Sequence, residues 1–425
     1  MEPRKLKLEL VFFHSPMHDF HVLAESRKTL LESLERRFRI SVISYKNISA
    51  EHFSDDSKVY IPFIASGGCE EIFQSFGFTL PLPLFFLFDE QHNSLPAALE
   101  LATYFSQGKL NTPLIYSERE LSEELVEQLH RMQLTVRKLR KTRVALFGDT
   151  SPWLLSSGID SDAVTRMLGV RFQEIEIESL AESFKHLTNL SRENQQLCRT
   201  ILKNSKELKN CSNQDVYNAV RMYQVMDEMM VYHSCNALAV KCFDLIDNCR
   251  TTACLALSLF NRAGIPAACE GDVPSLLTMM IASGLTQTPV FMANPVNYDR
   301  SQNTIEMAHC TIPLSMIERY SLNTHFESGI SVAVQGDIAP GEYFTAVKWL
   351  GGKLQRFFVS EGISLEADHY DNRCRTQLKL RLTEPVDSFL DKAIANHLLL
   401  VKGRHSRIFR YWNEYLIYKL SIYYL

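Results

Sequence analysis

The sequence lacks the short signatures by which several classes of protein are identified. It contains no Cys-x-x-Cys pair, no Gly-x-x-x-x-Gly-Lys-Ser/Thr loop, and no Gly-x-Gly-x-x-Gly segment after an expected strand. Its ten cysteines stand at irregular intervals, many of them inside apolar runs. This distribution predicts buried reduced thiols and indicates neither a zinc site nor a disulfide framework. Nor does any motif indicate a phosphate-cradling loop.

An excess of one charge and long apolar runs are missing as well. Lys and Arg together number 45 against 49 Asp and Glu, a formal net charge of -4, which gives no electrostatic reason to expect a nucleic acid partner. The longest apolar runs, such as residues 80–88, are shorter than a membrane span and are broken by prolines, so no transmembrane helix is expected. The first residues lack the apolar core and cleavage site of a signal peptide, which predicts a cytoplasmic protein.

What the chain does have is the length and composition of a multidomain globular protein. Its 425 residues are 46% hydrophobic and 22% charged, too many residues for one ordinary core. We expect an α/β fold with three domains, at residues 1–140, 141–288 and 289–425. The first two alternate strands and helices, which is typical of doubly wound sheets, whereas the third is rich in β segments and predicts a small barrel or sandwich before a terminal helix.

The expected elements follow from the apolar patterns of each region. The first domain contributes a helix at 23–38 and strands at 8–13, 40–44, 59–64 and 84–88. The second contributes strands at 144–148 and 237–243, with a long helix entered through a Ser212 or Asn213 cap. The third contributes strands at 290–294, 304–309, 330–335, 344–350, 356–361 and 377–382, and a helix at 409–425.

Acidic residues follow two apolar segments of the second domain. Asp244 stands at the carboxyl end of the expected strand 237–243, where open α/β sheets bind ligands, although a helix cap is an equal interpretation. Glu270 and Asp272 would face one side if their segment is extended, while the Val273-Pro274 that follows Asp272 also indicates a helix start. Paired acids suit a divalent metal, and oxygen ligands with one imidazole suit Mn²⁺ or Mg²⁺.

Several segments, taken together, resemble the L-fucose isomerase-like family. They are Cys242-Phe243-Asp244, residues 252–258, Cys269-Glu270-Gly271-Asp272, Ala308-His309-Cys310-Thr311, His325-Phe326-Glu327-Ser328-Gly329, Cys374-Arg375-Thr376, Asn396-His397 and Gly403-Arg404-His405. The resemblance covers the second half of the chain strongly and the first half only in architecture. It implies a metal-dependent aldose-ketose isomerase, which moves a proton between neighbouring carbons of a monosaccharide through an enediol.

The resemblance also implies roles for individual residues. Asp272 and His397 match the metal-binding aspartate and histidine of the family, and Asp244 is a further candidate ligand. Asp272, Asp244 and Glu270 are the candidate catalytic carboxylates. His309 and His325 would contact the sugar, with a purely structural role as the alternative for each.

One position departs from the family pattern. Cys254 stands where the related isomerases have a metal-binding glutamate, and a neutral thiol cannot replace a carboxylate at neutral pH. Either Asp244 or Glu270 has taken over that role, or the chemistry differs. The alternatives are therefore an isomerase of an acidic or sulfonated hexose, or a non-catalytic sugar-binding paralogue.

The family resemblance finally implies a homo-oligomer, a trimer or a hexamer, with sites near subunit boundaries. Three N-terminal residues, His14, His18 and Arg27, are expected to complete the pocket of a neighbouring subunit. The other expected partner is the monosaccharide substrate, with neither nucleic acid nor membrane.

Overall fold

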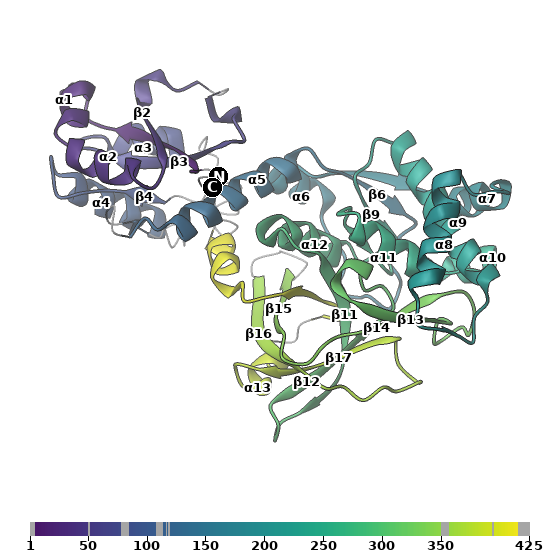
Figure 1. Cartoon of the computed structure of the whole chain (residues 1–425). Helices are drawn as coiled ribbons and strands as arrows, with labels where there is room; N and C mark the ends of the chain where they lie inside the picture. Colours follow the sequence, from purple (N-terminus) through teal and green to yellow (C-terminus); the bar gives the residue numbers. More distant parts are fainter. Residues whose placement is uncertain are drawn as a thin grey trace. The chain divides into compact units, whose positions relative to one another are not determined.

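The computed structural model describes residues 5–49, 52–77, 85–107, 114–115, 117, 120–349, 357–392 and 395–414. The described part of the chain forms two compact units (Figure 1). The first comprises the described residues up to Lys138 together with those from Arg407 onward, and the second comprises Leu139–Ser406. The division into three domains at 140 and 288 stays a prediction. Residues 84, 350, 356 and 415–425 of the expected elements lie outside the described residues.

The first unit is built on a parallel sheet with the strand order β2-β1-β3-β4-β5. Its central strand, β3, is apolar and buried from Val59 to Ile64, as expected for a strand covered on both faces. The expected helix at 23–38 is instead two short helices, and Arg27, which lies between them as the N-cap of the second, pairs with Asp89 at 2.8 Å. The strands are β1 (Lys7–Phe13), β2 (Arg39–Ser44), β3 (Lys58–Ile64), β4 (Phe86–Leu87) and β5 (Leu114–Ile115). The helices are α1 (Phe20–Glu25), α2 (Lys28–Glu35), α3 (Glu70–Gly77), α4 (Ser94–Gln107) and α5 (Glu123–Arg140), with 3-10 turns at Tyr45–Asn47 and His52–Ser54.

The second unit begins with another parallel sheet, of order β10-β9-β6-β7. Its strands are β6 (Arg143–Phe147), β7 (Arg171–Ile175), β9 (Ala237–Val240) and β10 (Ala267–Ala268). The helices are α6 (Ser161–Leu168), α7 (Ile177–His186), α8 (Arg192–Asn204), α9 (Asn213–Tyr232), α10 (Asp244–Cys249), α11 (Cys254–Arg262) and α12 (Val273–Thr286). Helix α9 starts at a capping box of Ser212 and Asp215, which confirms the expected Ser212 cap.

The same unit continues into a closed antiparallel barrel of order β11-β12-β17-β16-β15-β18, which confirms the expected β-rich, barrel-like region. The barrel strands are β11 (Val290–Asp299), β12 (Thr304–His309), β15 (Tyr343–Trp349), β16 (Phe357–Leu365), β17 (Thr376–Leu382) and β18 (Leu398–Lys402). The expected strand at 330–335 lies outside the barrel, in a small sheet of β8 (Leu208–Lys209), β13 (Arg319–Asn323) and β14 (Ala333–Asp337). A 3-10 turn at Leu314–Met316 and helix α13 (Val386–Leu390) complete the unit.

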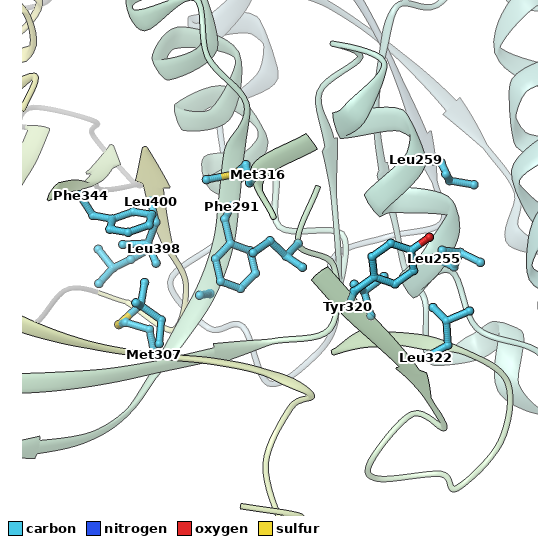
Figure 2. Packing of buried hydrophobic residues seen from close by; sticks show 14 of the residues in the cluster. Leu255, Leu259, Phe291, Met307, Met316, Tyr320, Leu322, Phe344, Leu398 and Leu400 are labelled. Atoms are coloured by element: carbon cyan, nitrogen blue, oxygen red, sulfur yellow. The ribbon is translucent and has the colours of Figure 1, made fainter. Parts of the chain in front are cut away.

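One buried cluster fills the barrel and extends to the neighbouring helices. Phe291, Met307, Phe344, Leu398 and Leu400 point inward from four barrel strands, and Figure 2 shows them packed together. The same cluster reaches Leu255 and Leu259 of α11 and Tyr320 and Leu322 of β13, seen on the right of Figure 2. Each fully buried side chain of this kind contributes about 1.5–3 kcal/mol to folding. This shared core therefore holds the barrel and α11 in one rigid arrangement.

Helix α12 joins the sheet to the barrel, since it begins just after β10 and ends just before β11. Nearly all of its residues are buried, and it packs against β15 and β18 of the barrel and β9 of the sheet. The start of α12 thus brings the carboxyl edge of the sheet against barrel residues. Within the described ranges, no helix has both the length and the apolar character of a membrane span.

Candidate functional site

A cavity of about 620 Å³ lies in the second unit and is lined by residues from both the sheet and the barrel. On the sheet side, Trp153, Phe243 and Glu270 follow the neighbouring parallel strands β6, β9 and β10. On the barrel side, His309 ends β12, and residues 325–327 come from the loop between β13 and β14. Ligands of open α/β sheets bind beyond the carboxyl ends of the strands, which is where this cavity lies.

The turn after β10 gives Glu270 its direction. Glu270 and Gly271 both have a left-handed backbone, with φ of 60° and 65°. A Cβ at Gly271 would lie 2.4 Å from the Asp149 carbonyl oxygen, so only glycine fits there. The amide of Ser151 donates to the Glu270 carbonyl at 3.0 Å and fixes the turn. Because the segment is not extended, the side chains of Glu270 and Asp272 do not face the same side. Glu270 lines the cavity, and Asp272 is the N-cap of α12.

Three side chains converge in a way that could hold a metal ion. Glu270, His309 and His397 each place one ligand atom within 4.8 Å of the others. Nε2 of His397 lies 3.5 Å from Oε1 of Glu270; it is buried and has no hydrogen-bond partner among the described residues. A buried nitrogen of this kind calls for an explanation, and a metal-ligand role supplies one. The Trp153 indole donates to Oε2 of Glu270 at 2.6 Å and orients that carboxylate.

Asp272 stands behind His397. Its Oδ2 accepts the Nδ1 proton of His397 at 2.8 Å, while its Oδ1 accepts the amide of Ser275 at 2.9 Å as the N-cap of α12. The Lys348 ammonium of β15 lies 3.3 Å from the same Oδ2, and both side chains are 1% exposed. A carboxylate in this position fixes the imidazole and directs its other nitrogen toward a metal. Asp272 is thus the hydrogen-bond partner of His397 and lies outside the three residues that could hold an ion, and its expected role as a metal ligand stays a prediction. The helix start at Asp272 is confirmed.

The charges of the site are set by burial and by these contacts. Burial alone would raise the pKa of Glu270 and of Asp272. The contact of Glu270 with His397, and the contacts of Asp272 with Lys348 and His397, outweigh burial, so both pKa values lie below the usual range. Burial lowers the pKa of His397, yet the hydrogen bond with Asp272 and the negative charges of Asp272 and Glu270 raise it more. Burial, helped by His397, lowers the pKa of His309 to about 3. His309 is thus neutral at pH 7, the form that binds a metal.

The cavity has an aromatic wall next to the triad. Trp153 and Phe243 meet edge to face with centroids 5.1 Å apart, and Phe243 meets His325 in the same way at 5.7 Å. Burial, and then the charge of Arg375, lowers the pKa of His325 to about 4, so this ring is neutral as well. Its Nδ1 pairs with the Ser328 hydroxyl at 3.0 Å. Such a wall suits the apolar face of a sugar ring, with His325 as a hydrogen-bonding group beside it.

Glu327 is the second carboxylate of the cavity. Among the described residues it has no hydrogen bond and no ion pair, although it lines the same space as Glu270. Burial, and then the negative charge of Glu270, raises the pKa of Glu327 above its usual range. Glu327 lies in the family-like segment 325–329, but the sequence alone indicates no role for it.

Cys254 is a buried cavity residue and lies outside the triad. It packs with Cys310 and Cys374, and a hydrogen bond with Cys310, followed by burial, raises its pKa well above the usual range. It is therefore a neutral thiol, as expected. The two other cavity thiols, Cys242 and Cys269, have their sulfurs 3.0 Å apart.

Asp244 lies apart from these residues. It occupies the first turn of α10, its carboxylate pairs with the Lys241 ammonium at 3.0 Å, and its side chain is 34% exposed. The cap position itself belongs to Phe243. Asp244 neither lines the cavity nor belongs to the group of Glu270, His309 and His397.

The three N-terminal candidates lie in the first unit. His14 is buried and its Nε2 pairs with the Ser44 hydroxyl at 3.0 Å, while Nδ1 of His18 pairs with the Ser66 hydroxyl at 3.0 Å. Arg27 is held by Asp89. Their expected role in the pocket of a neighbouring subunit stays a prediction.

Comparison with known proteins finds similarity to sulfoquinovose isomerases. The chain is 28% identical over 197 residues to the sulfoquinovose isomerase of Clostridium sp. (strain MSTE9), a match that covers 44% of this chain and 42% of that protein. It is 22% identical over 197 residues to the enzyme of the same name from Priestia aryabhattai, covering 45% and 43%. The match thus spans less than half the length of each relative. No family model matches the chain.

Proposed function

We propose that the protein is a metal-dependent aldose-ketose isomerase whose substrate is a sulfonated monosaccharide. The observation that carries the proposal is the convergence of Glu270, His309 and His397 beside a cavity that Glu270 and His309 line together with aromatic residues. The similarity to sulfoquinovose isomerases favours a sulfonated sugar over the neutral fucose or arabinose that the family resemblance alone suggests. Sulfoquinovose itself is a hexose that carries a sulfonate group.

Glu270, His309 and His397 would hold the ion, and Asp272 would keep His397 in the ligand orientation. Of the two expected ions, Mn²⁺ suits this set better than Mg²⁺, because two imidazole nitrogens are poor ligands for the harder ion. When bound, the ion would act as a Lewis acid toward the carbonyl and hydroxyl oxygens of the sugar.

The side chains of the cavity supply the remaining functions. His325, held neutral, can exchange hydrogen bonds with sugar hydroxyls, and Trp153 and Phe243 can cover an apolar sugar face. The reaction needs a group that takes the proton from C2 and returns a proton to C1, with an enediol between the two steps. Glu327 suits this role, since its carboxylate has no partner among the described residues and its raised pKa makes it a stronger base than an ordinary carboxylate.

A direct test is ketose formation by protein stripped of metal with a chelator and then supplied with Mn²⁺ or Mg²⁺. A sulfonated hexose and its neutral parent would serve as substrates. We expect turnover of the sulfonated sugar that requires the ion and is faster with Mn²⁺. Sugar binding that is independent of metal and gives no turnover would overturn the isomerase and indicate a sugar-binding paralogue.

Glu327→Gln should lower kcat about 10²- to 10⁴-fold, the usual contribution of a general acid or base, with little change in metal affinity. The amide keeps the size of the side chain but cannot carry the proton. Turnover and incorporation of solvent deuterium into the sugar would be measured together. Glu318→Gln, at an exposed acid that does not line the cavity, is the matched control. Unchanged exchange in Glu327→Gln would remove Glu327 from the proton transfer.

The cytoplasmic location and the trimer or hexamer remain predictions. Both belong to this proposal. A sugar isomerase of this family type is expected to form a homo-oligomer whose active sites lie near the subunit boundaries.

A further inference from the structure

The cavity carries one permanent positive charge. Among the described residues that line it, Arg373 is the only Lys or Arg, and it faces a space that also contains the acids Glu270 and Glu327. A guanidinium can donate to neutral hydroxyl groups, but it binds an ionised acceptor about twice as strongly. A ligand with an ionised tail needs a guanidinium, because an anion that enters beside two carboxylates is otherwise repelled.

Arg373 is fixed in place, yet part of its donor set is unused. Its Nη1 donates to the Glu306 carboxylate of β12, and its guanidinium lies over the Tyr370 ring at 4.3 Å from the centroid. The side chains of Arg373 and Glu306 are 21% and 20% exposed. Nε and Nη2 of Arg373 have no hydrogen-bond partner among the described residues. A guanidinium presents five donors in a planar fork, so an oxyanion can bind to the free edge while Glu306 holds the other.

The position of Arg373 matches the far end of a sugar whose reacting carbons lie at the triad. Glu306 and Ala308 are two residues apart in β12, so their side chains share the face that points away from the barrel core. Ala308 lines the cavity. Glu306, which holds Arg373, is three residues from His309 of the triad, about 10 Å along the strand. An open-chain hexose can span this separation, with its carbonyl end toward His309 and its last carbon toward Arg373. Asn372, the residue before Arg373, also lines the cavity.

We propose that Arg373, with Asn372, forms a subsite for the sulfonate at the far end of the substrate carbon chain. The proposal rests on the proposed function and adds the residue that would distinguish a sulfonated sugar from a neutral one. Glu306 acts here as a positioning residue, because it holds the guanidinium without occupying its free edge.

The test compares Arg373→Met with wild type in two assays. The first measures kcat/KM for a sulfonated hexose and its neutral parent. The second measures equilibrium binding of the corresponding sulfonated alditol, which has no carbonyl and cannot be isomerised. We expect Arg373→Met to weaken alditol binding and kcat/KM for the sulfonated sugar roughly 30-fold or more, the effect of removing one partner of a close charge pair. The kcat/KM for the neutral sugar should stay at the wild-type value.

Two further variants keep this test decisive. Arg373→Lys should restore part of the binding, because lysine retains the charge but loses the fork. Arg381→Met, on the exposed side of β17, is the matched control and should behave as wild type. Equal affinity of wild type and Arg373→Met for the alditol would overturn the subsite while leaving the isomerase intact. If wild type neither binds the alditol nor turns over any sugar, the proposed function and the subsite fail together.

Discussion

Glu270→Gln is expected to weaken binding of the divalent ion by more than about 100-fold and to reduce isomerisation in proportion. Even residues that merely orient metal ligands contribute 10- to 100-fold to affinity, and the loss of a ligand costs more. Glutamine can still accept the indole proton of Trp153, which now donates to Glu270 Oε2 at 2.6 Å, so the fold should be preserved. Binding of Mn²⁺ to the metal-stripped protein would be followed by calorimetry, with thermal melting as a check on folding.

A matched pair of histidine variants separates the triad from the rest of the cavity. His397→Gln should lose the ion as Glu270→Gln does, because Nε2 of His397 is the buried nitrogen aimed at Glu270. His325→Gln should keep wild-type Mn²⁺ affinity, since His325 lines the same cavity but lies outside the triad. Mn²⁺ affinity equal to wild type in both Glu270→Gln and His397→Gln would show that the ion, if bound at all, is bound elsewhere.

The sequence predicts where the strands of this fold lie along the chain better than it predicts which strands pair with each other. Apolar runs and turn residues locate most barrel strands, because burial on the pleated surface leaves a local pattern. The barrel order β11-β12-β17-β16-β15-β18 is not sequential, and no local pattern states it. The strand expected at 330–335 is β14, which pairs with β13 outside the barrel, and no local pattern states this either.

The candidate site was predictable as a neighbourhood but not as a set of contacts. Glu270 follows a parallel strand, and such strand ends meet at one edge of a sheet. The expected closeness of Asp272 and His397 is seen in their 2.8 Å hydrogen bond. The left-handed turn at Glu270 and Gly271, however, separates the two acids, and a backbone of that kind cannot be read from alternation. Lys348, which holds Asp272, is 76 residues away and left no local signal.

Two assignments had a usable local signal. Lys241 precedes Asp244 by three residues, the spacing of a helical ion pair, and this pair is what the structure contains. Glu327 lies between His325 and Ser328, which hydrogen-bond to each other and shape the loop that carries it to the cavity. The local signal for Glu327 as a proton carrier is thus its place between two polar residues of the same loop.

Asp272→Asn is expected to destabilise the protein by about 3–5 kcal/mol, the cost of removing one partner from a buried ion pair. Asparagine caps a helix about as well as aspartate, so the start of α12 should survive and the loss reports the charge. What remains is the Lys348 ammonium, 1% exposed and without its carboxylate. Burial already lowers the pKa of Lys348. The free energy of unfolding would be measured by denaturant titration, with Asp244→Asn, at an exposed pair worth about 0–1 kcal/mol, as the matched control.

The pH dependence of the unfolding free energy of Asp272→Asn gives a second, independent test of the Asp272–Lys348 ion pair. The pKa of Asp272 is below its usual range in the folded protein, owing to Lys348, His397 and Ser275 against the effect of burial. A group of this kind stabilises the fold above the unfolded aspartate pKa, about 3.9, and loses that contribution as the pH falls from there through the folded pKa. Asp272 also raises the pKa of His397, a contribution that is full below the unfolded histidine pKa of about 6.5. The difference in unfolding free energy between wild type and Asp272→Asn should therefore be largest between about pH 5 and pH 6 and shrink below pH 4.

Removing both partners should cost less than the two single changes together. In Asp272→Asn/Lys348→Met no buried ammonium or carboxylate is left unpaired, and replacing a buried ion pair by uncharged groups is often nearly neutral. The two residues are in contact, so their effects are expected to couple by about 0.5–3 kcal/mol in a double-mutant cycle. Additive losses would mean that Lys348 does not stabilise the Asp272 carboxylate. In that case Asp272, held by Ser275 alone, would orient His397. Lys348→Met should then leave Mn²⁺ affinity unchanged.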